Sequence, residues 1–164
     1  MSAITLVLHN IRSTYNVGAI FRSAEGFGVH EIICCGYTPY PIVSDDSRLP
    51  HIREKLTAQI HKSALGAEHM VPFRHFDTLE AWLKHNQSST HLPLVALEQA
   101  PNSQNLRDFT PPETFALILG EEVYGIENNY LEVCDFILEI PMRGQKESFN
   151  VSVAAGIALY GLSN

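Results

Sequence analysis

Ser148 and Asn150 stand directly before a long apolar run, Val151 to Leu162, and directly after the polar stretch Arg143 to Glu147. Serine and asparagine are common N-cap residues, so the run is predicted to be a helix that begins beside them. The first turn of a helix carries free backbone N–H groups, so a ligand in the preceding loop would be bound largely by main chain. The two side chains could equally be helix caps without a ligand, and their types alone leave both interpretations open.

The segment before this loop supplies the element that positions it. Phe136 to Ile140 is apolar and stops at Pro141, which predicts a strand, a tight loop and then the helix. Apolar side chains fall on nearly all sides of that helix, with Val153 and Ile157 away from the main stripe. Such a helix belongs in a core or an interface.

Asn16 and Arg22 lie in another predicted helix, about Asn16 to Phe27, which follows an apolar strand from Ile4 to Leu8. Counting along the helix, Arg22 lies about 200° from the apolar Ile20 and therefore points away from the core. An isolated arginine in such a position is most often a solvated surface residue.

Glu122 lies between Gly120 and Gly125 in a loop that follows the buried strand Phe115 to Leu119. Another buried strand, Leu92 to Glu98, also ends in a polar loop. In a parallel sheet, ligands bind outside the carboxyl ends of the strands, where both loops lie. Two glycines around an acid are common in turns, so the pattern gains weight only from its place between a buried strand and the C-terminal segment.

Strands and helices alternate along the whole chain, which predicts an α/β fold: a mostly parallel sheet with helices on both faces. We expect strands at 4–8, 31–35, 71–75, 92–98, 115–119 and 136–140, and helices at about 16–27, 49–65, 77–85, 127–134 and 151–162. Asp77 and Glu80 form an Asp-x-x-Glu variant of the capping box for the third helix, and Trp82 within it is predicted to be core. The length of 164 residues predicts a single domain, 1–164.

The charge balance argues against a generic nucleic-acid-binding protein. The chain has 11 basic and 18 acidic residues, a net charge of −7, whereas phosphate neutralisation needs clustered lysine and arginine. Local basic clusters occur at Arg48, Arg53 and Lys55 and at Arg143 and Lys146. An RNA substrate would therefore be bound by few, focused contacts or with the help of a second subunit.

The loop after residue 35 is rich in proline and glycine and is too irregular for a helix or strand. Its Tyr37 and Tyr40, near Arg48, could stack on bases. They could also pack the loop onto the core, and this second interpretation is somewhat favoured.

No run approaches the length of a membrane span, and the N-terminus lacks a basic region and a cleavage signal, so we expect a cytoplasmic protein without membrane association. Cys34, Cys35 and Cys134 lack the spacing of a zinc site or a disulfide framework and are expected to be buried thiols. The eight histidines, His61 and His69 among them, form no H-x-x-x-H or HExxH pattern, so no metal site is predicted.

Together the three polar stretches resemble the sequence motifs of the SpoU (TrmH-like) branch of the SPOUT methyltransferases. The string NVGAIFRSAEGFGVHEI is similar to motif 1, N-x-G-x-x-x-R; GEEVYG is similar to motif 2, G-x-E-x-x-G; and the segment 136–162 is similar to the C-terminal motif. The motifs stand in the family's order, and the resemblance covers nearly the whole chain. It implies an α/β fold with a deep C-terminal trefoil knot, which chain physics alone disfavours.

The resemblance also implies an S-adenosylmethionine (SAM)-dependent enzyme that methylates a ribose 2′-hydroxyl of tRNA or rRNA, and that forms a homodimer. It places the active-site residues at Asn16, Arg22, Glu122, Ser148 and Asn150. The cofactor is expected to contact Leu97, Gly120, Ile140, Met142, Ser148 and Phe149.

Family models give the motif 1 arginine a role in proton transfer. Because a guanidinium stays charged in proteins, our hypothesis is that Arg22 holds the neighbouring phosphate and the developing alkoxide, with Asn16 and Glu122 fixing its fork. Gly18 would let backbone or substrate approach closely at the start of the helix.

Three alternatives remain at this stage: a SPOUT enzyme that methylates a base, an RNA-binding or assembly factor of the same fold with little activity, and an unrelated nucleotide-binding α/β domain. The complete set of motif residues favours ribose methylation over the first two. The third lacks both GxxxxGK[ST] and a GxGxxG after a strand. N- and C-terminal RNA-binding extensions are not expected, since the chain starts near its first strand and stops after its last helix.

Overall fold

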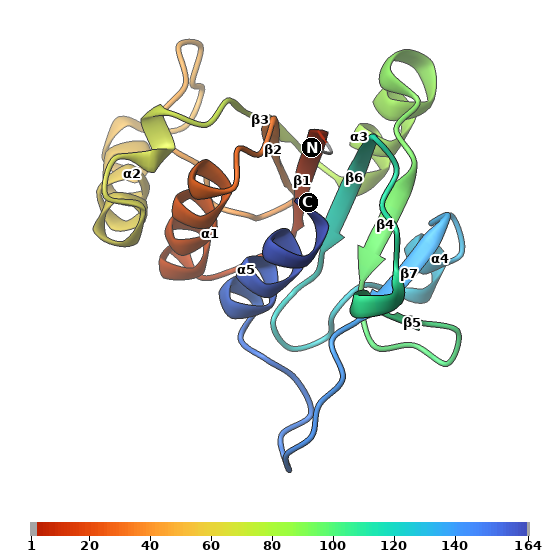
Figure 1. The fold of residues 1–164 in the computed structure, drawn as a ribbon. Coiled ribbons are helices and arrows are strands. Elements are labelled where there is room, and N and C mark those ends of the chain that lie inside the picture. The colour runs from red at the N-terminus through yellow and green to blue at the C-terminus, as the bar shows by residue number, and fades with distance from the viewer. Residues whose placement is uncertain (1–2, 164) are drawn as a thin grey trace.

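Seven strands form the centre of the molecule, and the computed structural model describes them within residues 3–163 (Figure 1). Their order across the sheet is β3-β2-β1-β6-β4-β7-β5, and every pairing between them is parallel. The strands are β1 (Ala3–His9), β2 (Glu31–Cys35), β3 (Phe73–Phe76), β4 (Leu94–Leu97), β5 (Gln104–Asn105), β6 (Thr114–Leu119) and β7 (Phe136–Glu139). The predicted parallel α/β fold is confirmed.

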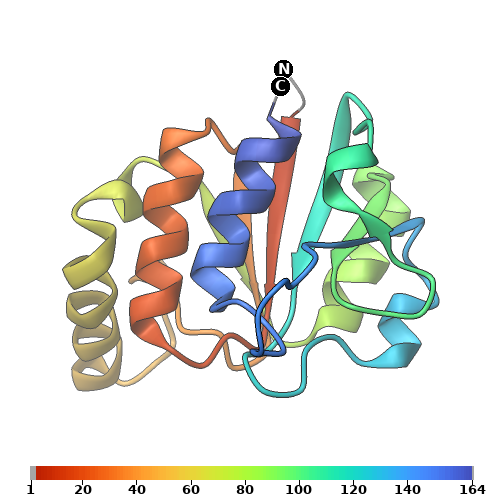
Figure 2. The same cartoon turned by 60° about the horizontal axis from the view of Figure 1, so that its bottom comes forward.

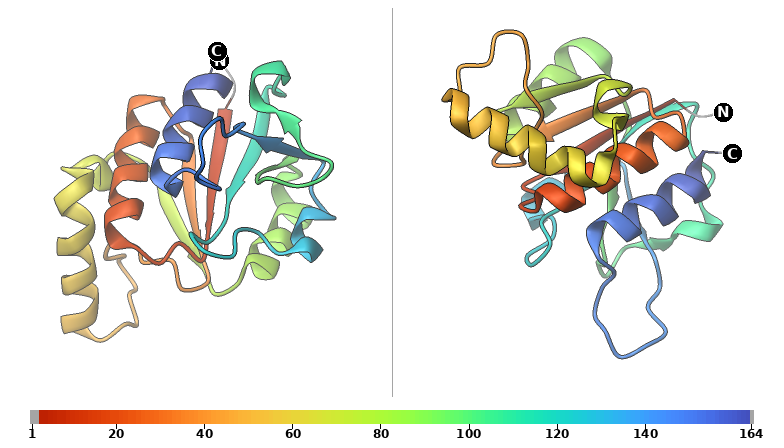
Figure 3. Two further views of the ribbon diagram at one scale, coloured as in Figure 1. Left: turned by 90° about the horizontal axis from the view of Figure 1, so that it is seen from below. Right: turned by 90° about the vertical axis from the view of Figure 1, so that its left-hand side faces the viewer.

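Helices cover both faces of the sheet. Three long helices lie side by side on one face: α2 (Pro50–Ala64), α1 (Thr14–Gly26) and α5 (Val151–Leu162) (Figure 3). The shorter α3 (Leu79–His85) and α4 (Asn128–Leu131) cover the opposite face. Short helical turns complete the chain: η1 (Ala67–His69), η2 (Asn86–Thr90) and η3 (Leu106–Asp108). Within residues 3–163, no helix combines the length and apolarity that crossing a membrane would need.

The strand sequences explain this layering. In β1, Ile4, Leu6 and Leu8 pack beneath the long helices, whereas Val7 faces the opposite layer with α3 and α4. Successive strand residues point to opposite faces, so a strand covered on both faces must be apolar at nearly every position. Trp82 of α3 is 1% exposed, which confirms its predicted place in the core.

Some local details differ from the sequence predictions because they depend on single polar contacts. The N-cap of α3 is Thr78, whose hydroxyl accepts the backbone N–H of Ala81, so the predicted Asp77 cap is wrong. Glu80 instead accepts a hydrogen bond from the hydroxyl of Tyr130 on α4. The strand β5 and the short helical turns were not predicted, because elements of two to five residues show no hydrophobic period.

Gly18 serves helix packing. A Cβ built at this position would lie 2.3 Å from the backbone oxygen of Ile60 and 2.2 Å from the hydroxyl of Ser63, both on α2. The predicted close approach at this glycine is therefore between two helix backbones, α1 and α2.

β1 and β6 are neighbours in the middle of the sheet, and the connections that follow them lead to opposite sides of the sheet. After β1 the chain passes through α1 to β2, and after β6 it passes through α4, on the other face, to β7. Such a reversal opens a crevice at the carboxyl ends of the two strands, which is where open α/β sheets bind ligands. Asn16, at the start of α1, and Glu122, in the loop after β6, both lie at this edge.

Candidate active site

Glu122 joins the loop after β6 to the start of α1. Its carboxylate accepts hydrogen bonds from the backbone N–H of Arg12 (3.1 Å), the backbone N–H of Ser13 (3.2 Å) and the amide of Asn16 (3.1 Å). Burial alone would raise the pKa of this carboxyl, but the N–H donors outweigh burial and hold the pKa below its usual range. Glu122 is therefore an anion at neutral pH whose oxygens are already engaged, which suits a residue that positions its neighbours.

Asn16 connects this carboxylate to the C-terminal helix. Its side chain is buried, and its Oδ1 accepts a hydrogen bond from Nδ2 of Asn150 at 3.2 Å. Asn150 is the N-cap of α5, with its Oδ1 accepting the backbone N–H (2.9 Å) and the hydroxyl (2.7 Å) of Ser152. Asn150 is therefore both a helix cap and a site residue. We term the chain of Glu122, Asn16 and Asn150 the Glu–Asn–Asn bridge.

Arg22 lies apart from this bridge. Six residues after Asn16, it is about 9 Å further along α1 and about 120° around the helix. Its side chain is exposed and makes no hydrogen bond or ion pair with any residue in the range 3–163. The part of our hypothesis in which Asn16 and Glu122 fix the fork of Arg22 is not seen, because Glu122 is engaged by the backbone of Arg12 and Ser13 instead.

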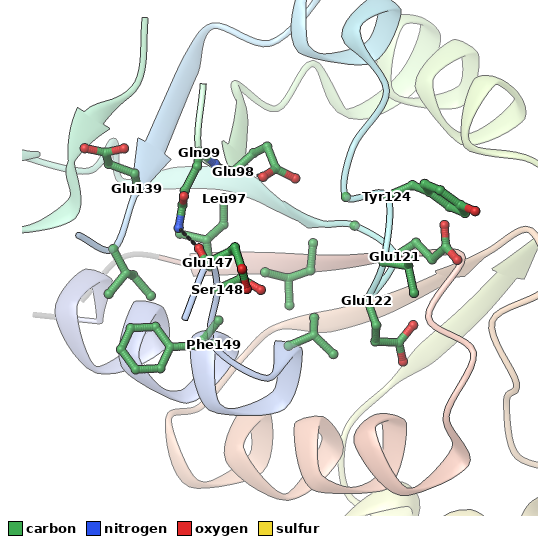
Figure 4. A pocket seen from close by; sticks show the side chains of 17 residues that line it. Leu97, Glu98, Gln99, Glu121, Glu122, Tyr124, Glu139, Glu147, Ser148 and Phe149 are labelled. Carbon is green, nitrogen blue, oxygen red and sulfur yellow. Dashed lines mark hydrogen bonds between the residues drawn. The ribbon is translucent and has the colours of Figure 1, made fainter. Parts of the chain in front are cut away.

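A cavity of about 360 Å³ opens beside the bridge, between the loops that follow β4, β6 and β7 (Figure 4). Of the predicted cofactor-binding residues, five line it, and Met142 does not. The five are Leu97, Gly120, Ile140, Ser148 and Phe149. The floor of the cavity is apolar where Leu119 and Val151 contribute, and its volume falls in the range of roughly 300–1,000 Å³ typical of cofactor sites.

The wall of this cavity is acidic. Its lining residues include five glutamates and no lysine or arginine: Glu98, Glu121, Glu122, Glu139 and Glu147. Glu98 is fixed by the backbone N–H of Ile126 at 3.0 Å and of Gln99 at 2.8 Å, and the Gln99 amide in turn donates to the backbone oxygen of Glu147 at 2.8 Å. The cavity therefore suits a ligand that is positively charged.

Gly120 and Gly125 close the motif 2 loop by direct backbone contact. A Cβ at Gly120 would lie 2.5 Å from the carbonyl carbon of Gly125. Gly125 has a φ of +68°, and a Cβ there would lie 2.1 Å from a carboxylate oxygen of Glu98. A side chain at either glycine would therefore displace the loop that carries Glu122.

Arg12 is a site residue that the sequence analysis missed. Besides its backbone bond to Glu122, its guanidinium donates to Glu121 at 3.1 Å. Tyr37 lines the same cavity as Arg12, and its side chain, followed by the charge of Glu121, raises the pKa of Arg12. A single arginine in a loop before a helix carries no sequence signal for such a role.

A histidine–glutamate cluster and a buried cysteine outside the crevice have structural explanations. His61 and His69 both approach the buried carboxylate of Glu68, which helps end α2 by accepting the backbone N–H of Gly66 at 2.9 Å. This contact accounts for the three side chains, and the absence of a metal site stays a prediction. Burial raises the pKa of Cys35 to about 12, as expected for a buried thiol.

Solved structures of RNA methyltransferases share this fold. The AdoMet-bound rRNA methyltransferase from Sinorhizobium meliloti aligns with a TM-score of 0.78 at 19% identity, covering 97% of this chain and 55% of that one. A structure described as giving insights into the 2-OH methylation of C/U34 on tRNA aligns with a TM-score of 0.73 at 23% identity, covering 97% of this chain and 93% of that one. At such identities the likeness shows the fold alone.

Sequence similarity identifies the family. The model of the SpoU rRNA Methylase family matches residues 3–160, and the chain belongs to this family. The 23S rRNA (guanosine-2'-O-)-methyltransferase RlmB of Nitrosomonas europaea is 34% identical over 158 residues, covering 96% of this chain and 55% of the relative. The chain thus spans a little over half the length of this curated relative.

Proposed function

We propose that the protein is a SAM-dependent RNA methyltransferase that modifies a ribose 2′-hydroxyl of tRNA or rRNA. The observation that carries this proposal is the Glu–Asn–Asn bridge, which joins all three motif segments at the wall of a cofactor-sized cavity. Membership of the SpoU family and the similarity to RlmB, named for guanosine 2′-O-methylation, support ribose over base as the acceptor. The cytoplasmic location that we expected is part of the same proposal.

The cavity fits the cofactor in charge and in shape. SAM carries a positive sulfur and a positive ammonium group, and the five glutamates of the lining complement that charge. Apolar side chains such as Leu97 and Ile140 suit the flat, neutral adenine ring. Membership of the SpoU rRNA Methylase family supports the same assignment. We assign cofactor contact to Gly120, Ser148 and Phe149 as well, and Met142 would join them if its loop moved inward.

When bound, SAM supplies a methyl group on a positive sulfur, so catalysis needs mainly alignment and removal of the hydroxyl proton. Glu122 and Asn16 act as positioning residues, because their hydrogen bonds fix the start of α1 against the wall of the cavity. Asn150 holds the first turn of α5, and Ser148 lines the cavity directly before it. The role of Arg22 as an electrostatic clamp on phosphate and alkoxide stays a prediction.

Methyl transfer from labelled SAM tests the function. Pools of tRNA and rRNA that lack the modification are incubated separately with the protein, digested to nucleosides and analysed by mass spectrometry. We expect a 2′-O-methylnucleoside from one pool. A methylated base would move the protein to the other SPOUT branch, and SAM binding without transfer would favour an RNA-binding or assembly factor.

Arg22→Ala tests the clamp. We expect the variant to lose turnover while its SAM affinity and unfolding free energy stay close to those of the native protein, because Arg22 is exposed and does not line the cavity. The exposed Arg107, on η3, is the matched control: Arg107→Ala should keep full turnover. If Arg22→Ala loses SAM binding together with turnover, the assignment is wrong.

We also propose that the protein is a homodimer that associates through the outer face of α5. This face leaves Val153, Ile157 and Tyr160 exposed on a helix that is otherwise apolar and packed. Val153→Glu should shift the mass measured by light scattering at micromolar concentration from dimer to monomer. Val133, 52% exposed against 50% for Val153, lies off this face, so Val133→Glu should leave the dimer intact. A native protein that is monomeric under these conditions refutes the proposal.

We further propose that the C-terminal segment is knotted. The chain runs from β7 across the sheet edge to α5, beside the loop that follows β6 (Figure 2). The bonds of Asn150 to Asn16 and of Gln99 to Glu147 hold this crossing in place. The test is an experimental structure of the protein: pulling the ends of its Cα trace must leave a trefoil, and a trace that straightens refutes the knot.

A further inference from the structure

A second cavity, of about 350 Å³, lies at the same edge of the sheet, beyond the carboxyl ends of β1, β2 and β3. Arg12 belongs to its lining, and the same residue donates its backbone N–H to Glu122 and its guanidinium to Glu121 on the wall of the cofactor cavity. The two cavities are therefore neighbours, connected by the bonds of Arg12 to the motif 2 loop.

The two cavities differ in charge. The lining of the second includes Arg12, Arg48 and His75 and no aspartate or glutamate. Two carboxylates that border this cavity are already paired: Asp46 with Arg48, whose hydrogen bonds hold the pKa of the Asp46 carboxyl well below its usual range, and Glu121 with Arg12, whose side chain stays 70% exposed. On a chain with a net charge of −7, this cavity is a local site that suits an anion.

Tyr40 forms the rigid back of the second cavity. Its ring stacks on His75, with centroids 4.2 Å apart, and the Arg48 guanidinium covers its other face at 3.7 Å. Arg48 also donates to the backbone oxygens of Tyr40 and Pro41, at 2.9 and 3.1 Å, which fixes the loop. Tyr40 therefore packs its loop onto the core, as the favoured interpretation predicted, and has no open face for a base.

The Tyr37 ring, unlike that of Tyr40, is open to solvent. It is 53% exposed, and no aromatic ring within residues 3–163 stacks on it. Its backbone N–H is held by the side chain of Asn10 at 3.2 Å, so the ring projects from a fixed point of the loop. Beside it stands the Arg12 side chain, which is 70% exposed. An open aromatic ring next to an exposed guanidinium is the pair of groups that binds a base and its phosphate.

We propose that this second cavity holds an unpaired RNA nucleotide next to the one that is methylated, with its base stacked on Tyr37 and its phosphate on Arg12. The inference rests on the proposed function, because it takes RNA as the substrate. Since Arg12 lines this cavity and is bonded to Glu121 and Glu122 of the cofactor cavity, a nucleotide held here places the neighbouring ribose close to the cofactor cavity. Focused contacts of this kind also explain how an acidic protein binds RNA.

RNA binding, measured by filter retention at fixed salt with the unmodified tRNA and rRNA pools as probes, tests the subsite without any need for turnover. Tyr37→Leu should weaken binding of the accepted pool roughly 5- to 100-fold, the usual effect of losing one base–aromatic stack, and Tyr37→Trp should restore it. SAM affinity should stay within about twofold for both variants. The control is Tyr15→Leu, a tyrosine of α1 that is 67% exposed and lines neither cavity, which should bind RNA normally.

The outcomes separate this proposal from the proposed function. If the native protein binds RNA but transfers no methyl group, the function fails while the variants still decide the subsite. If Tyr37→Leu binds RNA within twofold of the native protein, or if native protein binds neither pool, the subsite is refuted. A parallel loss of SAM affinity would assign Tyr37 to the cofactor cavity and would also overturn the proposal.

Discussion

Glu122→Gln removes one charge and keeps the shape of the side chain, which makes it the sharpest test of the Glu–Asn–Asn bridge. One carboxylate oxygen accepts from Ser13 and Asn16, and the other from Arg12. A glutamine oxygen can keep the first two bonds as neutral ones, but its NH₂ group then faces the Arg12 N–H, a donor against a donor. A hydrogen bond to a charged group contributes about 1.5–3 kcal/mol, so the unfolding free energy should fall by about that amount.

The neighbouring acid provides the control. Glu121, whose side chain is 11% exposed, pairs with the Arg12 guanidinium, which is 70% exposed; solvent screens the pair from that side, so its contribution is about 1 kcal/mol or less. Glu121→Gln therefore changes the net charge equally but should cost far less stability. Urea unfolding at pH 7 measures both, and Glu122→Gln should also lower the melting temperature by about 4–8 °C. Equal losses for the two variants, within about 0.5 kcal/mol, would refute the role assigned to the bridge.

The pH dependence of the unfolding free energy provides a second test of the hydrogen bonds of Glu122. The folded-state pKa of Glu122 is lowered, so its contribution is fully present above its unfolded pKa of about 4.3 and is lost as the pH falls through the folded value. The stability difference between the native protein and Glu122→Gln should be constant above about pH 5 and shrink below about pH 4.3. A difference that grows toward acid pH would contradict this sign.

Two further substitutions test other parts of the framework. Gly125→Ala places a Cβ 2.1 Å from the Glu98 carboxylate at a φ of +68°, so urea unfolding should show a loss of about 1–3 kcal/mol, whereas Gly144→Ala, with no atom within 4 Å, should change little. Asp46→Asn should destabilise the protein at pH 7 by weakening the bonds from Arg48. Because the folded pKa of Asp46 is lowered, the native protein should lose this stability only below about pH 4; a variant whose acid unfolding matches the native profile would refute the contact.

The sequence predicts the elements that have long apolar runs. Strands such as β1 and β6 are buried on both faces, so their composition alone identifies them, and the order of strands and helices then leaves few alternatives to a parallel sheet. The direction of Arg22, away from the core, also follows from the helical period. The cap of α3 was not predictable, because Asp77 and Thr78 are both good N-cap residues and only the backbone decides between them.

The sequence predicts most residues of the candidate site but not the hydrogen bonds between them. Motif spacing identifies Asn16, Glu122 and Asn150, but only the fold shows that they bond to one another. Arg12 was missed, and Tyr37 was considered as a stacking residue only beside Arg48, because a cation and an aromatic ring in separate loops share no spacing. The sheet brings Arg12 and Tyr37 together by placing the ends of β1 and β2 side by side. A local sequence pattern does not show which distant residues the fold brings together.

The length of chain between the partners of the Glu–Asn–Asn bridge has a consequence for how the protein is made. Asn16 and Glu122 are separated by 106 positions, and Asn16 and Asn150 by 134. During synthesis the amino-terminal strands leave the ribosome first, and contacts of such high sequence separation form late. The bridge cannot close until the segment that carries Asn150 has emerged, so the three motif segments are joined only after every strand of the sheet has been synthesised.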